Sequence, residues 1–253
     1  MASRPKSAET PPPTLAAVHK RMRALADPAR AANLARFFKT GPGDYAEGDK
    51  FLGITVPQTR GVLREVITLP FTDTLKLLQS PWHEERLLAL LLLVARMRKA
   101  DNAEQTRIYE AYLGHTGYIN NWDLVDLSAR DIVGLYLAQR PRTVLDTLVL
   151  STHLWERRIA VVATFYFIGR GEFDDSVRVA RALLGDKHDL IHKAVGWMLR
   201  EIGKRDRAVL ETFLRAHATE MPRTMLRYAI EHFPEAQRQA YLAKGKVRRV
   251  GPR

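Results

Sequence analysis

Apolar residues recur along nearly the whole chain at the three- and four-residue spacing of a helix. Near the start of the chain, Leu15, Val18, Met22 and Leu25 would share one helical face. No segment alternates strictly between apolar and polar residues for more than a few positions, and apolar runs such as 159–165 continue a helical period. The pattern therefore predicts an all-α protein without β-strands.

Capping residues and prolines indicate where these helices begin. Asp27 before Pro28 is typical of an N-cap with proline in the first turn, and Asp101 and Asn121 are predicted caps of later helices. Residues 39–56 interrupt the pattern with four glycines, one proline and several charges, so we expect a long loop there. A loop of this length in a compact helical chain favours a functional role. Further helix starts are predicted at Pro57, Thr72, Pro81, Pro141, Ser151, Phe173, Asp186, Asp206 and Pro222.

A recurring segment predicts a repeat architecture. In each copy a basic residue is followed by small or apolar residues that include alanine: EERLLAL contains Arg86, ERRIAVV contains Arg158, IHKAVGW contains Lys193, and MLRYAI contains Arg227. These basic residues lie 72, 35 and 34 positions apart, and the midpoint of the longest interval is Trp122. A period of 34–36 residues with two helices per unit is typical of an α-solenoid.

The predicted fold is an α-solenoid of HEAT-like two-helix repeats, curved and with a basic concave face. The repeat domain is expected to span residues 14–243, between a disordered head (1–13) and a basic flexible tail (244–253). The alternative is that basic helix starts recur by chance in a basic chain. If the repeat is real, one face carries Arg86, Trp122, Asp126, Arg158, Lys193 and Arg227.

The charge balance favours a polyanionic partner. Forty lysines and arginines against 28 acidic residues give a net charge of +12, of which the tail contributes five positive charges and the head one. About half of the excess therefore belongs to the helical body, which indicates nucleic acid more readily than a neutral partner. The alternative is a generic basic surface.

The composition also limits compartment and class. The absence of cysteine excludes disulfides and thiolate metal sites and is simplest in a reducing compartment, so we expect a cytoplasmic protein, associated with the nucleoid if bacterial. The longest apolar run, 87–95, is about half the ~20 residues of a membrane span. We expect a monomer that does not enter membranes.

Trp122 and Asp126 form the most distinctive chemical pair. Separated by four residues, they would share one helical face. A carboxylate on a phosphate-binding wall is useful where the ligand is cationic, as an alkylated purine nucleotide is. Its glycosidic bond breaks with little need of a general acid, which leaves an oxocarbenium-like sugar to stabilise and a water to position. Both tasks suit a carboxylate.

Several simpler interpretations remain open. Asp126 would also form an ordinary helix-surface ion pair with Arg130. Trp155 is better explained by packing, and Trp197 fits a core residue as well as a ligand contact. His188 and His192 have the spacing of two metal ligands but no evident third, so no metal site and no cofactor are predicted.

Several of these segments together resemble the DNA alkylation repair enzymes, the AlkD-like HEAT-repeat DNA glycosylases. The resemblance covers most of residues 14–240 and rests on KTGPGDYAEGDKFLGITVPQTR (39–60), NNWDLVD (120–126), WERRIA (155–160), HKAVGWMLRE (192–201) and PRTMLRYAIE (222–231). It implies an all-α solenoid that removes cationic N3- or N7-alkylated purines from double-stranded DNA without a metal.

The resemblance also implies roles for particular residues. The family's catalytic aspartate falls on Asp126, its paired tryptophans on Trp122 and Trp197, and its arginine on Arg158. Arg158 is then expected to hold a phosphate next to the lesion, and Lys193, Arg86 and Arg227 to bind other phosphates more weakly through their positive charge. Two positions depart from the family pattern: Thr55 replaces a polar amide and Phe37 an aromatic hydroxyl, which leaves the details of DNA contact open.

Three functions therefore compete. The first is a DNA glycosylase that uses Asp126, and the second is a non-catalytic protein that binds DNA structure through its basic repeat face. The third is a protein-scaffolding solenoid, against which the positive charge argues.

Overall fold

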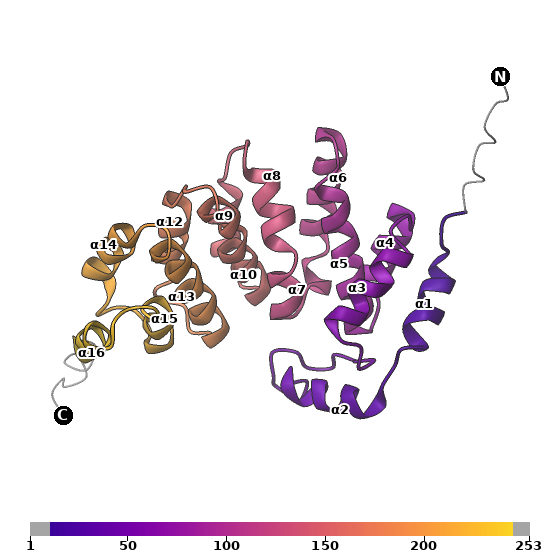
Figure 1. Cartoon of the computed structure of the whole chain (residues 1–253), viewed down its shortest axis with the longest axis horizontal. Helices are drawn as coiled ribbons and strands as arrows, with labels where there is room; N and C mark the ends of the chain where they lie inside the picture. Colours follow the sequence, from indigo (N-terminus) through magenta and orange to yellow (C-terminus); the bar gives the residue numbers. More distant parts are fainter. Residues whose placement is uncertain (1–10, 245–253) are drawn as a thin grey trace, which may run out of the picture. The chain divides into compact units, whose positions relative to one another are not determined.

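The computed structural model describes residues 11–244, and these form two compact units. The first unit ends at Ala95 and the second begins at Arg96. The described residues contain helices and no strand, apart from one isolated bridge between Lys50 and Trp82 (Figure 1). The all-α prediction is confirmed. Parts of the predicted head and tail, residues 1–10 and 245–253, lie outside the described residues.

The first unit is built from five helices, the last of which runs two residues into the second unit. Asp27 caps one of them by accepting the N–H of Arg30, and Thr55 caps another in a reciprocal capping box with Gln58. The predicted loop between them is confirmed. The helices are α1 (Leu15–Arg23), α2 (Pro28–Phe37), α3 (Val56–Glu65), α4 (Phe71–Leu78) and α5 (His83–Met97).

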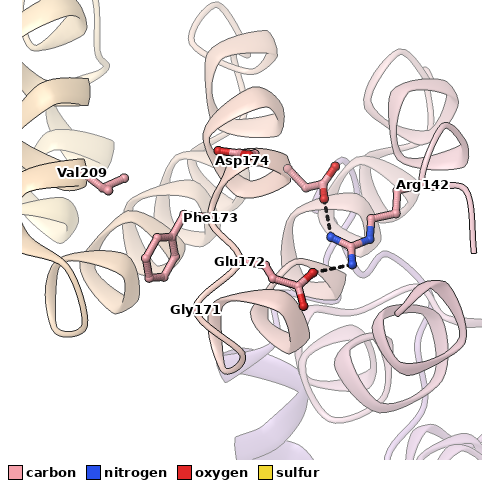
Figure 2. Close-up of a pocket in the computed structure, with 7 residues that line it drawn as sticks. Arg142, Gly171, Glu172, Phe173, Asp174 and Val209 are labelled. Atoms are coloured by element: carbon pink, nitrogen blue, oxygen red, sulfur yellow. Dashed lines mark hydrogen bonds and ion pairs between the residues drawn. The ribbon is translucent and has the colours of Figure 1, made fainter. Parts of the chain in front are cut away.

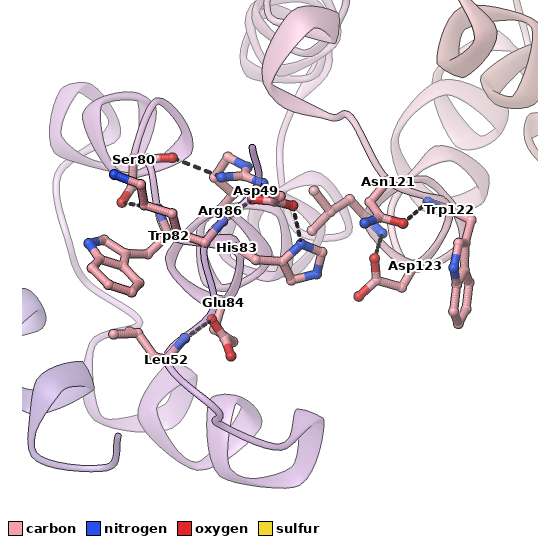
Figure 3. Close-up of polar contacts among 12 residues, drawn as sticks. Asp49, Leu52, Ser80, Trp82, His83, Glu84, Arg86, Asn121, Trp122 and Asp123 are labelled. Atoms are coloured by element: carbon pink, nitrogen blue, oxygen red, sulfur yellow. Dashed lines mark hydrogen bonds and ion pairs between the residues drawn. The ribbon is translucent and has the colours of Figure 1, made fainter. Parts of the chain in front are cut away.

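One carboxylate holds the end of that loop. Glu84, in the first turn of α5, accepts the backbone N–H groups of Leu52, Gly53 and Ile54 at 2.8, 2.8 and 3.1 Å. Figure 3 shows the bond from Leu52. Gly53 has a φ of +82°, and a Cβ at this position would overlap the backbone oxygen of Asp27. The end of the loop is therefore held through its backbone N–H groups. Only a glycine at position 53 lets the backbone pass so close to the start of α2.

The second unit continues as helix upon helix. Asn121 and Asp101 cap their helices as predicted, and Asp206, a predicted helix start, is the N-cap of its helix. The helices predicted from Pro141, Ser151 and Asp186 begin three residues later. The elements are α6 (Asn102–Gly114), η1 (Thr116–Tyr118), α7 (Trp122–Asp126), the π-helix η2 (Arg130–Gly134), α8 (Leu135–Leu137), α9 (Val144–Val149), α10 (Leu154–Ala163), α11 (Phe165–Ile168), α12 (Asp174–Ala182), α13 (Asp189–Gly203), α14 (Arg207–His217), α15 (Arg223–Ala229) and α16 (Glu235–Lys244).

Successive helices of this unit pack on one another. α10 lies against α7, α9 and α13, and α13 lies against α14 and α15 (Figure 1). Two glycines occupy equivalent contacts: a Cβ at Gly134 would overlap Tyr166 and the backbone of Ala163, and a Cβ at Gly196 would overlap Tyr228 and the backbone of Met225. Neighbour-on-neighbour packing with recurring close contacts is what an α-solenoid-like fold requires.

A hydrogen-bond motif at the start of the longer helices shows the repeat in detail. The Ser80 hydroxyl donates to Glu85 and accepts the N–H of Trp82, while the Arg86 guanidinium donates to the Ser80 carbonyl at 3.0 Å (Figure 3). We call this arrangement the helix-start clamp. Because it ties the turn before the helix to the first helical turn, it fixes the direction in which the helix leaves.

The same clamp recurs in the second unit, 71 residues later. The Ser151 hydroxyl donates to Glu156, and the Arg157 guanidinium donates to the Ser151 carbonyl at 2.9 Å. In the next copy Asp186 takes the place of the serine, and the His192 Nε2 donates to the Asp186 backbone carbonyl at 2.5 Å.

The structural repeat therefore differs by one residue from the one read from the sequence. The equivalent of Arg86 is Arg157, and not Arg158 as the alignment of EERLLAL with ERRIAVV suggested. Trp122 keeps its place in the series, since it lies 36 residues after Arg86 and 35 before Arg157. One residue of offset turns a side chain by about 100° around the helix, so Arg157 and Arg158 face different surroundings.

Among residues 11–244, none of the helices has the length and apolar content that crossing a bilayer would need.

Candidate functional site

Asp126 is the last residue of α7, a helix of five residues. The Asn121 side chain caps the helix by accepting the N–H of Trp122 at 2.8 Å, and Trp122, its first residue, is half-buried (Figure 3). The tryptophan thus stands at one end of a short, capped helix and the carboxylate at the other. The predicted helical relation between Trp122 and Asp126 is confirmed.

Asp126 forms a two-pronged ion pair with Arg158 of α10. The Arg158 Nε donates to Asp126 Oδ1 at 2.9 Å and Nη2 donates to Oδ2 at 2.8 Å, while Nη1 donates to the Leu190 carbonyl of α13 at 2.6 Å. The Asp126 side chain is 18% exposed and that of Arg158 6%. The predicted alternative partner, Arg130, instead has its guanidinium over the Phe165 ring, 4.9 Å from the centroid.

Opposing forces act on the Asp126 carboxyl. Burial raises its pKa, the charge and hydrogen bonds of Arg158 lower it, and the neighbouring Asp123 charge raises it again; the net pKa lies above the usual range for an aspartate. A carboxylate shielded from water in this way interacts strongly with any positive charge that develops nearby.

The geometry leaves Asp126 able to act on a ligand. Each Asp126 oxygen accepts one Arg158 hydrogen bond, and a carboxylate oxygen has a second lone pair. The exposed part of the side chain can therefore accept a proton from water or face a cationic sugar, while Arg158 keeps the group in one orientation.

Trp197 stands in a neighbouring cluster. Its ring meets Phe165 edge-on at 5.5 Å, and it is half-buried. It follows Leu190 by seven residues on α13, about 10 Å along the helix axis. The structure therefore joins Asp126 to Arg158 directly and places Trp197 against Phe165. Trp155 is only 4% exposed, as its packing interpretation predicted.

The predicted phosphate-binding residues differ in availability. In the first unit, the Arg86 side chain is 4% exposed and pairs with Asp49 at 2.7 Å, so its guanidinium is not at the surface to meet a phosphate. Arg158 uses three of its donor groups inside the protein, which also speaks against the phosphate role. Lys193 is 40% exposed beside Asp189 at 2.8 Å, and Arg227 is exposed on α15.

The repeat position of Arg157 escaped the sequence interpretation. The pattern Ser-x4-Glu-Arg at 80–86 and 151–157 pairs Arg86 with Arg157. An alignment of the charged runs by composition pairs Arg86 with Arg158 instead. Thr55 and Phe37, the two departures from the family pattern, are the N-cap of α3 and a residue of α2 with 64% exposure.

A cavity of about 400 Å³ in the second unit is lined by Arg142, Glu172, Asp174 and Asp175, but Arg142 already pairs with Glu172 and Asp175 (Figure 2). Within residues 11–244, no three or more His, Cys, Asp or Glu side chains gather as metal ligands.

Comparison with known proteins gives the family. Residues 18–233 match the family model described as DNA alkylation repair enzyme. The chain is also similar to the solved structure of a predicted DNA alkylation repair enzyme from Enterococcus faecalis, with 16% identity and a TM-score of 0.66 over 83% of this chain and 97% of that chain. At that identity the likeness shows the fold alone. A search among curated proteins found no match. Because the family model spans most of its length, this chain belongs to the DNA alkylation repair enzyme family.

Proposed function

We propose that this protein is a monomeric DNA glycosylase that excises cationic N3- and N7-alkylated purines from duplex DNA. The observation that carries the proposal is the carboxylate of Asp126, partly exposed and fixed in one orientation by Arg158, four residues from Trp122. Membership of the DNA alkylation repair enzyme family supports alkylated DNA as the substrate. The geometry supports the chemistry.

In the proposed reaction the glycosidic C1′–N bond breaks, and its electron pair leaves with the base and neutralises the purine's formal positive charge. The sugar becomes positive at the same time, and the Asp126 carboxylate stabilises it. A water molecule then adds to C1′ and gives its proton to Asp126. The products are a free alkylpurine and an abasic site.

Arg158 positions Asp126 in this proposal and does not contact phosphate, which revises the role expected from the sequence. Trp122 and Trp197 pack against the sugar and backbone of the damaged nucleotide. Lys193 and Arg227, which are more exposed, bind phosphates of the same DNA.

The test compares Asp126→Asn with Asp174→Asn on a duplex that contains 7-methylguanine. Asp174 is exposed at the start of α12, so both variants change the net charge equally. We expect Asp126→Asn to slow base release at least ~100-fold with DNA affinity within about threefold, and Asp174→Asn to change neither much. Full base release by Asp126→Asn would rule out the proposed mechanism.

The ion pair itself favours one alternative, a protein that binds DNA without excising bases. The Arg158 charge neutralises much of the Asp126 field, and a neutralised carboxylate stabilises a cationic sugar less well. This alternative predicts salt-dependent DNA binding by the wild-type protein and no release of methylated bases. A scaffold for proteins alone would be indifferent to DNA.

A further inference from the structure

The helix that carries Asp126 is broken directly after this residue. The longer helices α5 and α13 run for 15 residues each, but α7 ends at Asp126. Two turn residues follow, and the chain becomes helical again at Ala129, directly before the π-helix η2. Interruptions of this kind occur often at functional sites. The orientation of Asp126 therefore depends on what holds the break.

A buried serine closes the break. In a continuing α-helix the Ser128 N–H would donate to the Leu124 carbonyl. It donates instead to Val125 at 3.1 Å, and the Ser128 hydroxyl donates to the Leu124 carbonyl at 2.5 Å. The side chain thus satisfies a carbonyl that the interrupted helix leaves without its usual partner.

A buried tyrosine on α6 fixes that serine. The Tyr112 hydroxyl lies 2.9 Å from the Ser128 hydroxyl, and since the Ser128 hydrogen points to Leu124, the Tyr112 hydroxyl is the donor. Both residues have 0% exposure. They therefore do not contact DNA themselves, and their influence on a bound ligand passes through the more exposed Asp126.

We propose that Tyr112 and Ser128 are positioning residues that hold the helix break so that Asp126 meets the reacting sugar. This inference rests on the proposed glycosylase function. Arg158 fixes the carboxylate from the side of α10, and the two hydroxyls fix its backbone from the side of α6. A displacement of about 1 Å in such a group costs up to ~100-fold in rate.

The test measures single-turnover base release and DNA affinity for Ser128→Ala and Tyr112→Phe. Ser128→Ala removes both hydrogen bonds, and we expect base release at saturating protein to fall about 10- to 100-fold with DNA affinity within about twofold. Tyr112→Phe leaves the bond from Ser128 to Leu124, so its effect should be smaller. Rates equal to wild type in both variants would overturn the proposal.

Thr164→Val is the matched control. Thr164 is 1% exposed, lies at the junction of α10 and α11, and donates to the Val161 carbonyl at 2.7 Å. Thr164→Val therefore loses a buried hydroxyl-to-carbonyl hydrogen bond in the same unit, but not at the turn that follows Asp126. An equal loss of base release in Thr164→Val and Ser128→Ala would show that general destabilisation, and not positioning, is responsible.

A second readout separates this inference from the proposed function. The NMR signal of the Arg158 Nε proton reports its bond to Asp126, with Asp126→Asn as the reference for a lost pair. We expect Ser128→Ala to shift this signal and Thr164→Val to leave it in place. If wild-type protein releases no base, the glycosylase proposal fails, and an unshifted Arg158 signal in Ser128→Ala would then overturn the positioning role as well.

Discussion

Glu84 gives the sharpest prediction about the first unit. Glu84 is 2% exposed, and its carboxylate accepts three consecutive backbone N–H groups, from Leu52 to Ile54. Glu84→Gln keeps the size of the side chain but replaces one accepting oxygen by an NH2 group. The remaining oxygen can keep Gly53 and Ile54, so the new donor faces the N–H of Leu52.

The magnitude follows from the bonds lost. A buried hydrogen bond to a charged group contributes about 1.5–3 kcal/mol, and a neutral one about 1 kcal/mol. Glu84→Gln loses one charge-assisted bond and weakens two, so we expect it to lower the free energy of unfolding by about 3–4 kcal/mol. Because the loss is local to the loop, amide hydrogen exchange at residues 52–54 should accelerate more than elsewhere in this unit.

The assay is urea denaturation followed by the circular dichroism of the helices, together with amide exchange. Glu65→Gln serves as the control, since Glu65 pairs with Arg21 on the surface and should change stability little. Unchanged exchange at residues 52–54, with a stability loss below about 0.5 kcal/mol, would refute the view that Glu84 holds the loop.

Three further predictions concern stability and DNA binding. Gly53→Ala should lower the free energy of unfolding by about 3 kcal/mol or more, because its Cβ would overlap Asp27 at a positive φ; denaturant titration measures this. Burial raises the pKa of Asp49, but its bonds with His83 and Arg86 outweigh this and hold the pKa below its usual range. The resulting stability is present above about pH 4 and is lost as the pH falls through the lower, folded-state pKa, so Asp49→Asn should make the urea midpoint less dependent on pH below about 4. Arg227→Ala should remove about one phosphate contact, and so lower by about 1 the slope of log affinity against log salt concentration in filter-binding measurements. An unchanged slope would contradict the proposed role of Arg227.

The register of the repeat shows where interpretation of the sequence ended. Charged runs at 84–90 and 156–162 align well by composition, which pairs Arg86 with Arg158. The hydrogen bonds to Ser80 and Ser151 pair Arg86 with Arg157 instead. Composition along a helix tolerates a shift of one residue, but hydrogen-bond geometry does not, because the side chain turns by about 100°.

Local chemistry was therefore determined by the sequence itself: the helices, the caps at Asp27 and Asn121, the long loop before α3, and the unusual pair of Trp122 and Asp126. These features depend on residues within a few positions of one another. Only the tertiary structure decided that Arg158 faces Asp126 from 32 residues away and that Ser128 and Tyr112 hold the turn beside it. Such pairings depend on how separate helices pack and on the water this packing excludes, and no spacing along the chain encodes either.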